Sequence, residues 1–149
     1  MKDIKRLVLY ILLTLGIGSF PVLFIKFDTY KYLIKPPLSP SSIVFPIVWT
    51  IIFILISISL YRISLKDDDI NLKLLYFLGL FVNALWTPLF FGLNLYLFSF
   101  LWLIILLIII LFTFYKFYIV DKISGYLFIP YIIWLLFAGY LNLFIYLLN

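Results

Sequence analysis

The sequence contains no cysteine and no histidine, and these two absences exclude a large part of protein chemistry. Without these residues there is no disulfide framework, no thiolate or imidazole metal site, no catalytic Cys/His pair and no imidazole proton relay. Charged residues are also scarce, at 11% of the chain. Most metal-dependent and nucleophilic enzyme chemistry is therefore out of reach for this chain.

What the sequence does contain is apolar and aromatic surface. Of its 149 residues, 67% are hydrophobic and 22% are aromatic, so too few polar residues remain to cover a water-soluble globule. The net charge of +5 comes from basic residues that are scattered at the ends of apolar runs, as is typical of membrane-flanking charge. We expect an integral membrane protein with lipid around it and no nucleic-acid partner.

Five apolar stretches are each about long enough to cross a hydrocarbon core of ~30 Å at a rise of 1.5 Å per residue. They are too long and too unalternating for barrel strands, and helices satisfy their own backbone hydrogen bonds in lipid. The sequence therefore predicts an all-α, five-transmembrane-helix bundle that forms a single domain over residues 1–149. The expected helices are approximately 7–25, 43–61, 72–91, 95–115 and 123–148.

The basic residues predict the orientation of this bundle. One side of the membrane carries eight of them: Lys2, Lys5, Arg6, Arg62, Lys66, Lys73, Lys116 and Lys122. The opposite side carries three, all in the first loop: Lys26, Lys31 and Lys35. By the positive-inside rule we expect a cytoplasmic N-terminus, with the first loop and the C-terminus outside.

Two connecting segments are long enough to examine. The acidic segment 65–73, "LKDDDINLK", lacks the spacing and the glycine of an EF-hand and is interpreted as a solvated loop. The first loop, residues 26–42, contains Pro36, Pro37 and Pro40, which make it stiff and extended or turn-like. A stiff loop that carries lysine and tyrosine is suited to act as a lid.

Polar residues inside the third stretch are harder to explain. In "NALWTPLFFG", Asn83, Trp86, Thr87 and Phe90 fall on one helical face, and Pro88 removes a backbone donor, which predicts a kink or local opening. The segment "PYIIWLLFAGYLN" in the fifth stretch has a similar arrangement of a proline beside an aromatic and amide face. There, a proline is followed by three residues at fourfold spacing: Trp134, Ala138 and Asn142.

Two interpretations of these faces stay open. Asparagine and threonine commonly link transmembrane helices by hydrogen bonds, and small residues permit close packing. Alternatively, aromatic walls with a few polar groups form a site for a flat apolar ligand. All four tryptophans lie within apolar stretches rather than in loops, which an interfacial aromatic belt does not explain.

In these residues the chain resembles the TspO/MBR family, the tryptophan-rich sensory proteins related to the mitochondrial translocator protein, or peripheral benzodiazepine receptor. The first-loop pattern of the family is echoed by Tyr30, Leu33, Lys35, Pro36, Pro40, Val48 and Trp49. The third-helix pattern N-x-x-W-[ST]-P-x-F-F-G is matched by Asn83, Trp86, Thr87, Pro88, Phe90, Phe91 and Gly92. The fifth-helix pattern is matched by Pro130, Tyr131, Trp134, Phe137, Ala138, Leu141 and Asn142.

The resemblance implies a compact five-helix bundle, often a homodimer, with a ligand cavity between the helices under the first loop. It implies that this cavity binds a porphyrin, and in some members sterols or synthetic isoquinoline and benzodiazepine ligands. The residues implied to line or adjoin it are Trp49, Asn83, Trp86, Thr87, Phe90, Trp134 and Ala138. We expect the propionates of a porphyrin to meet the lid through Lys26, Tyr30, Lys31 and Lys35.

The chain also departs from the family pattern. Where the family has tryptophans in its first loop, this sequence has Thr29, Leu38 and Ile43. Loop tryptophans are implicated in the light-dependent degradation of protoporphyrin by some bacterial members. Because this loop lacks them, we rank that activity second, after binding of the porphyrin. No basic residue follows Lys122, so the C-terminal sterol pattern of animal members is missing.

Three functions follow as hypotheses. The first is a protein that binds, senses or transports a planar hydrophobic ligand, with protoporphyrin IX as the leading candidate and without any cofactor or metal ion. The second is an enzyme that degrades the porphyrin in light, although no catalytic residues are apparent, because the helices carry no pair suited to ground-state acid/base chemistry. The third is a small structural membrane protein whose polar residues only pack helices.

Overall fold

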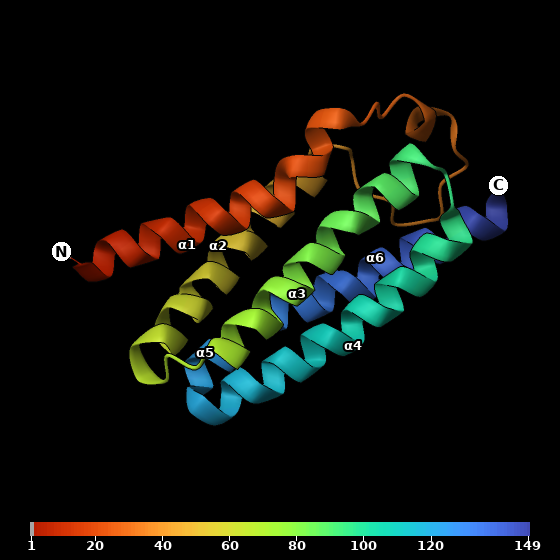
Figure 1. Ribbon diagram of the computed structural model, residues 1–149. Helices are drawn as coiled ribbons and strands as arrows, with labels where there is room; N and C mark the ends of the chain where they lie inside the picture. Colours follow the sequence, from red (N-terminus) through yellow and green to blue (C-terminus); the bar gives the residue numbers. More distant parts are fainter. Residues whose placement is uncertain (1) are drawn as a thin grey trace.

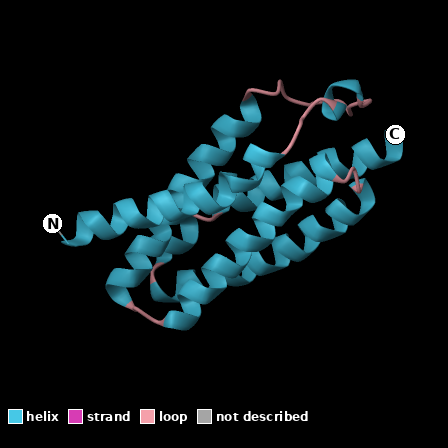
Figure 2. Ribbon diagram, turned by 45° about the horizontal axis from the view of Figure 1, so that its top comes forward, coloured by secondary structure: helices cyan, strands magenta, loops and turns pink. Residues whose placement is uncertain are grey.

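The computed structural model describes residues 2–149, apart from the side chain of Lys2. Lys2 was counted above among the basic residues near the N-terminus, and its charge lies outside the described part. Long helices make up most of the chain: α1 (Lys2–Ser19), α2 (Val44–Lys66), α3 (Ile70–Thr87), α4 (Tyr96–Val120) and α6 (Ile129–Leu148). Shorter elements join or extend them: η1 (Phe20–Phe24), η2 (Thr29–Tyr32), η3 (Pro88–Gly92) and α5 (Lys122–Tyr126). No strand occurs within residues 2–149 (Figure 2).

Five helical segments are long and apolar enough to cross a membrane, as the sequence predicts. They are Asp3–Phe24, Val44–Lys66, Ile70–Gly92, Tyr96–Val120 and Lys122–Leu148. The first, second and fourth spans begin or end several residues beyond the apolar stretches, at ends that carry charged residues. A helix continues there because long basic side chains lay their methylene stems along the apolar surface and keep the charge in water. The all-α, multi-pass membrane fold is confirmed.

The spans form one ring of neighbouring helices. Helix α1 packs against α2 and α3, α3 packs against α4, and α4 packs against α6, while α2 approaches the last span most closely at α5. Figure 1 shows the N-terminus, the α2–α3 turn and the α4–α5 turn at one end, and the first loop and the C-terminus at the other. We call these the N-terminal end and the loop end of the bundle.

The last span is broken rather than continuous. Asp121 is the N-cap of α5 and its side chain accepts a hydrogen bond from the Ser124 backbone N–H, and two residues separate the end of α5 from the start of α6. Pro130 therefore lies in the first turn of α6, where a missing N–H costs nothing, and not in the interior of one continuous helix as the sequence suggested. Gly125 is required at this break because a Cβ there would lie 2.8 Å from the Cα of Tyr118.

The third span opens at Pro88, as predicted. The α-helix ends at Thr87, and Pro88–Gly92 continue as one wider π-helical turn. Its hydrogen bonds include Leu93 N–H to the Pro88 carbonyl at 2.9 Å, the five-residue step of a π-turn. The extra residue in this turn brings both Phe90 and Phe91 toward the ring cluster described below, where their centroids lie 4.8 Å apart.

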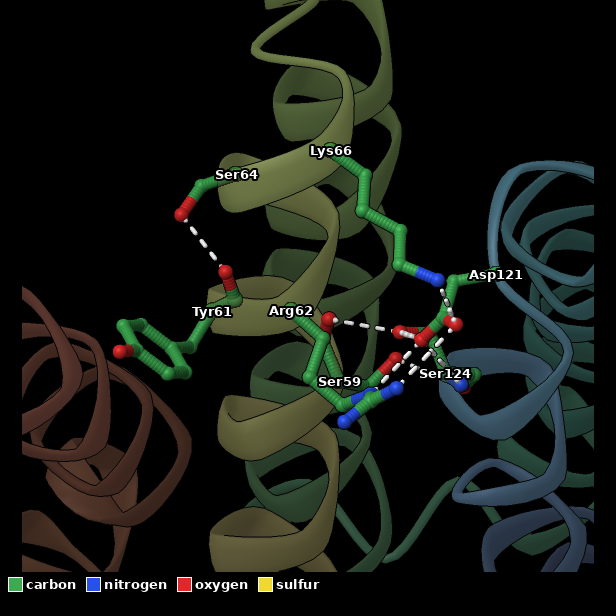
Figure 3. A network of polar contacts seen from close by, with 7 residues as sticks. All are labelled: Ser59, Tyr61, Arg62, Ser64, Lys66, Asp121 and Ser124. Carbon is green, nitrogen blue, oxygen red and sulfur yellow. Dashed lines mark hydrogen bonds and ion pairs between the residues drawn. The ribbon is translucent and has the colours of Figure 1, made fainter. Parts of the chain in front are cut away.

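A charged network closes the N-terminal end (Figure 3). The buried carboxylate of Asp121 accepts from Arg62 Nε at 2.7 Å, from Lys66 Nζ at 2.6 Å and from Ser124 Oγ at 2.6 Å. Ser59 adds a bond to the Ser124 carbonyl at 2.7 Å. Chiefly through the Arg62 guanidinium, this environment holds the pKa of Asp121 well below its usual range. The network ties α2 to the junction of α4 and α5.

Candidate functional site

A small pocket lies under the first loop, at the place where the resemblance implies a ligand cavity. Its volume is about 20 Å³, roughly the space of one water molecule. Rings and aliphatic side chains from the loop, α2, η3, α3 and α6 surround it. The lining residues are Tyr30, Phe45, Trp86, Phe90, Phe91, Ala138, Leu141, Asn142 and Ile145. The walls are aromatic, but their own side chains fill most of the space between the helices.

Tyr30 brings the first loop into this pocket. Its ring contacts Phe91 at a centroid distance of 5.6 Å and Phe45 at 6.3 Å. The ammonium group of Lys35 lies 4.7 Å from the centroid of the same ring, within cation–π range. Burial raises the pKa of the Tyr30 phenol, so the ring stays neutral. Tyr30 therefore closes the pocket from the loop side, with one cation beside its mouth.

Three hydrogen bonds from α6 and its end hold the loop over the pocket. The Asn149 side chain accepts from the Ile34 backbone N–H and donates to the Ile34 carbonyl, both at 2.9 Å. The Tyr140 hydroxyl donates to the Pro37 carbonyl at 2.7 Å. Leu38, directly after this contact, has a φ of 68° and turns the chain back toward α2. The loop that was expected to act as a lid thus lies over the pocket and is held there by hydrogen bonds in this structure.

The amides on the polar faces bond to other side chains of the bundle. Asn83 donates to the Tyr131 hydroxyl at 2.5 Å and so links α3 to α6. Asn142 accepts from Trp86 Nε1 at 3.0 Å and from Ser99 Oγ at 3.1 Å, and donates to the Tyr96 carbonyl at 2.7 Å. These contacts match the helix-packing interpretation of the amides, because the groups satisfy one another.

A second recess opens on the outside of the bundle between α2 and α6. It is an open groove of about 520 Å³, lined by Val48, Ile51, Ile52, Pro130, Ile133, Trp134 and Phe137. Here the two helices are bridged by rings, with Trp49 lying 5.9 Å from Tyr131 and 6.4 Å from Trp134 between centroids. Since both helices are membrane spans, the groove faces hydrocarbon. Trp134 Nε1 is buried and has no hydrogen-bond partner within residues 2–149.

The residues predicted for the site fall into separate groups. Trp86, Phe90, Ala138 and Tyr30 line the small pocket. Trp134 lines the groove, and Trp49 lies in the ring cluster beside it. Asn83 is buried in its bond with Tyr131, and Thr87 is half-buried on the same helix.

The three lysines of the first loop differ in whether they contact the residues that line the pocket. Lys35 contacts the Tyr30 ring at the mouth of the pocket, whereas Lys26 and Lys31 are exposed and Lys31 pairs with Asp28 at 3.7 Å. Among the three, Lys35 is therefore the cation in contact with a lining residue.

Several residues at the site were missed from the sequence. Phe45 lines the pocket and touches Trp134, with ring centroids 5.9 Å apart. Asn142 was recognised only as part of a pattern, although fourfold spacing from Trp134 and Ala138 was a signal for it. Asp121, at the opposite end of the bundle from the site, also had a clear signal in the sequence: a single aspartate between two apolar spans is typical of a helix N-cap.

Fold and pocket together define a class: a polytopic all-helical membrane protein with an aromatic site between its helices under an ordered loop. The TspO/MBR family model matches residues 8–148. Protein CrtK of Rhodobacter capsulatus is 36% identical over 136 residues, covering 89% of this chain and 85% of the relative. Tryptophan-rich protein TspO of Archaeoglobus fulgidus is 37% identical over 153 residues, covering 99% of each chain.

A third relative, the tryptophan-rich sensory protein of Cereibacter sphaeroides, is 32% identical over 115 residues, covering 77% of this chain and 73% of the relative. Both the family match and these identities extend over most of the chain. The protein belongs to the TspO/MBR family, as the motifs of its first loop and its third and fifth helices predicted.

Proposed function

We propose that this protein binds a planar, largely apolar ligand between its helices, with a porphyrin such as protoporphyrin IX as the best candidate, and senses or transports it. One observation carries the proposal: a continuous cluster of rings, running from Tyr30 through Phe45 to Trp134 and Trp49, contains a buried indole N–H that finds no acceptor among the described residues. Rings provide flat apolar contact, and a ligand with a carbonyl or carboxylate supplies the missing acceptor.

The cations near the loop fit the acidic groups of such a ligand. Lys35 already lies against the Tyr30 ring at the pocket mouth, and the other loop lysines are exposed at the same end. Because ammonium–carboxylate contacts are stronger than neutral hydrogen bonds, these lysines would hold one propionate at the loop end, and the other propionate would be the acceptor for the Trp134 N–H. Binding requires Tyr30, Phe45 and their neighbours to move, since a pocket of about 20 Å³ is far below the volume of a porphyrin.

That small volume favours a second candidate, a membrane protein whose polar and aromatic residues only pack helices. The mutual bonds of Asn83 with Tyr131 and of Trp86 with Asn142 support this alternative. It does not account for the buried Trp134 N–H, which helix packing alone leaves at a cost of about 1–3 kcal/mol.

The experiment is a titration of the purified protein in micelles with protoporphyrin IX, followed by indole quenching and porphyrin absorbance. We expect saturable binding to wild type and at least about fivefold weaker binding to Trp134→Phe, since one hydrogen bond of about 1 kcal/mol is lost. Trp102→Phe is the matched control, because the Trp102 N–H already bonds to the Val82 carbonyl at 2.7 Å. Binding no different from that of empty micelles would establish the packing function instead.

The same samples test the enzymatic alternative. Porphyrin absorbance is compared in light and in darkness, with empty micelles as the control. We expect bound porphyrin to bleach no faster than the control, because the loop lacks the tryptophans found in the family pattern. Faster bleaching in light would assign a photochemical activity to the binding site.

We infer that the N-terminal end of the bundle faces the cytoplasm. The structure groups Arg6, Arg62, Lys66 and Lys73 at this end, where they bond to Ser64, Asp121 and Asp68. The excess of basic residues over those of the first loop sets the direction by the positive-inside rule. Labelling of a cysteine introduced into the loop or the acidic turn, in intact cells, tests this orientation in a chain that has no native cysteine.

A further inference from the structure

The small pocket and the α2–α6 groove are separated by a single pair of rings. Phe45 lines the pocket, Trp134 lines the groove, and their centroids lie 5.9 Å apart in an edge-on contact. On α6 the two spaces are one helical turn apart, because Ala138 lines the pocket and Trp134 precedes it by four residues. On α2 they are also one turn apart, since Phe45 lines the pocket and Val48 the groove.

The groove is open to the bilayer, whereas the pocket is closed on the loop side. Ile51 and Ile133 on the two walls of the groove are 52% and 62% exposed, and both belong to membrane spans. On the other side, the three hydrogen bonds of Asn149 and Tyr140 and the Tyr30 ring cover the pocket. A flat apolar molecule dissolved in lipid therefore meets the groove first.

The ring pair is also easier to displace than the loop. Moving the loop away breaks three hydrogen bonds from α6, whereas the Trp134 indole N–H has no partner within residues 2–149 to lose. Phe45 has no polar side-chain group, so edge-on ring contacts alone join the two residues across the gap. Rotation of these two side chains joins the groove to the pocket in one space.

We propose that the α2–α6 groove is the lateral entrance of the ligand site, and that Phe45 and Trp134 form its gate. The occupant of the groove is the same planar apolar ligand in transit from the bilayer, so this inference rests on the proposed function. It adds a route and two gating residues: the ligand passes between α2 and α6 at the depth of the hydrocarbon, and not beneath the first loop.

The experiment measures rates as well as affinity. Wild type and variants in phosphatidylcholine nanodiscs are mixed with protoporphyrin IX, and binding and release are followed by porphyrin absorbance in a stopped-flow instrument. Ile133→Trp fills the groove from α6, and Ile51→Trp fills it from α2. Ile108→Trp on α4 is the matched control, because Ile108 is 61% exposed against 62% for Ile133 and does not line the groove. Equal melting temperatures verify that the variants fold.

We expect both groove variants to slow association and dissociation by about tenfold and to leave the dissociation constant within about twofold, as for an obstructed path to an unchanged site. Ile108→Trp keeps wild-type rates. Asn149→Ala, which removes two of the three hydrogen bonds that hold the loop, also keeps wild-type rates because the ligand does not pass there.

Three results would overturn the gate. Wild-type rates in both groove variants would exclude this path. Faster association in Asn149→Ala would place the entrance under the loop. A weakened dissociation constant with faster release in Ile133→Trp would make the groove the resting site and not a passage. Failure of wild type to bind protoporphyrin at all is a different result, since it removes the proposed function and the route together.

Discussion

The two ends of the bundle are held together by different chemistry. At the N-terminal end, Asp121 joins Arg62, Lys66 and Ser124 through charge-assisted bonds of 2.6–3.2 Å. At the loop end, the described contacts are mainly between rings, with a few neutral hydrogen bonds from Asn142, Asn149 and Tyr140. The first set fixes atoms at defined distances, whereas the second depends mostly on apolar contact.

This difference indicates that the N-terminal end anchors the helices, whereas the loop end is the part that can rearrange. A charge-assisted hydrogen bond is short and directional, and it weakens steeply once its donor–hydrogen–acceptor angle falls below about 120°. Ring contacts are broad in geometry and tolerate sliding and rotation. The N-terminal end can therefore keep the helices in register even when side chains at the loop end rearrange.

Removing the Asp121 charge should have the largest effect on stability. Asp121→Asn leaves Arg62 and Lys66 without a counter-ion, and we expect a loss of about 2–3 kcal/mol. This is below the usual cost for a fully buried pair because the Arg62 and Lys66 side chains are 32% and 50% exposed. Thermal unfolding in micelles measures it. Asp68→Asn, whose carboxylate is 62% exposed beside Lys73, is the control and should melt like wild type.

Acid should weaken the same network in wild type. The folded protein holds the pKa of Asp121 below its usual range, so the stabilisation is fully present above the unfolded value of about 3.9. It is lost as the pH falls below that value and through the folded pKa. The difference in melting temperature between wild type and Asp121→Asn should stay constant from pH 7 to about 5 and shrink below about 4. A difference that is independent of pH would contradict the assignment of the ion pair.

Removing the central amide at the loop end should have a smaller effect. Asn142→Leu keeps the volume but leaves Trp86 Nε1 without its acceptor and Ser99 without one of its two acceptors. We expect a loss of about 1–2 kcal/mol, typical of interhelical hydrogen bonds in membranes. Chemical denaturation in micelles checks the value. A loss larger than that of Asp121→Asn would reverse the contrast between the two ends.

Unfastening the loop should have the smallest effect. Tyr140→Phe removes only the bond to the Pro37 carbonyl, and we expect a loss of about 0.5–1 kcal/mol or less in global stability. Amide hydrogen exchange of residues 33–39 should accelerate, because this bond holds the loop locally. Tyr146→Phe, at an exposed position on the same helix, should leave that exchange unchanged. Unaltered exchange in both variants would show that Asn149 alone fastens the loop.

The sequence predicted those features that depend on composition and local pattern. The lengths of the apolar stretches predicted the five spans, and Pro88 predicted the opening in the third span. Both predictions follow from backbone hydrogen bonding alone. The family motifs placed Trp86, Phe90 and Ala138 in segments that meet under the loop. The predicted lid is a covering loop in the structure, whereas the homodimer and the ligand itself stay predictions.

What the sequence did not predict depends on contacts between distant segments. Pro130 was expected inside a helix, yet the Asp121 cap and the close approach at Gly125 start a separate short helix and shift the proline to a first turn. The fastening of Ile34 by Asn149 joins residues 115 positions apart. Neither contact has a periodic signature, because the Gly125 contact arises only when α4 and α5 pack together and the Asn149 contact only when the first loop meets the end of α6.

The unpartnered N–H of Trp134 has a thermodynamic consequence for selectivity. A buried donor without an acceptor raises the free energy of the unliganded protein by about 1–3 kcal/mol. Any molecule that brings an acceptor to it recovers this amount, which corresponds to a factor of roughly 5–150 in affinity. A lipid chain offers shape and surface but no acceptor. If the protein binds a ligand as proposed, this energetic penalty favours a flat molecule with a polar edge over the large excess of hydrocarbon around it.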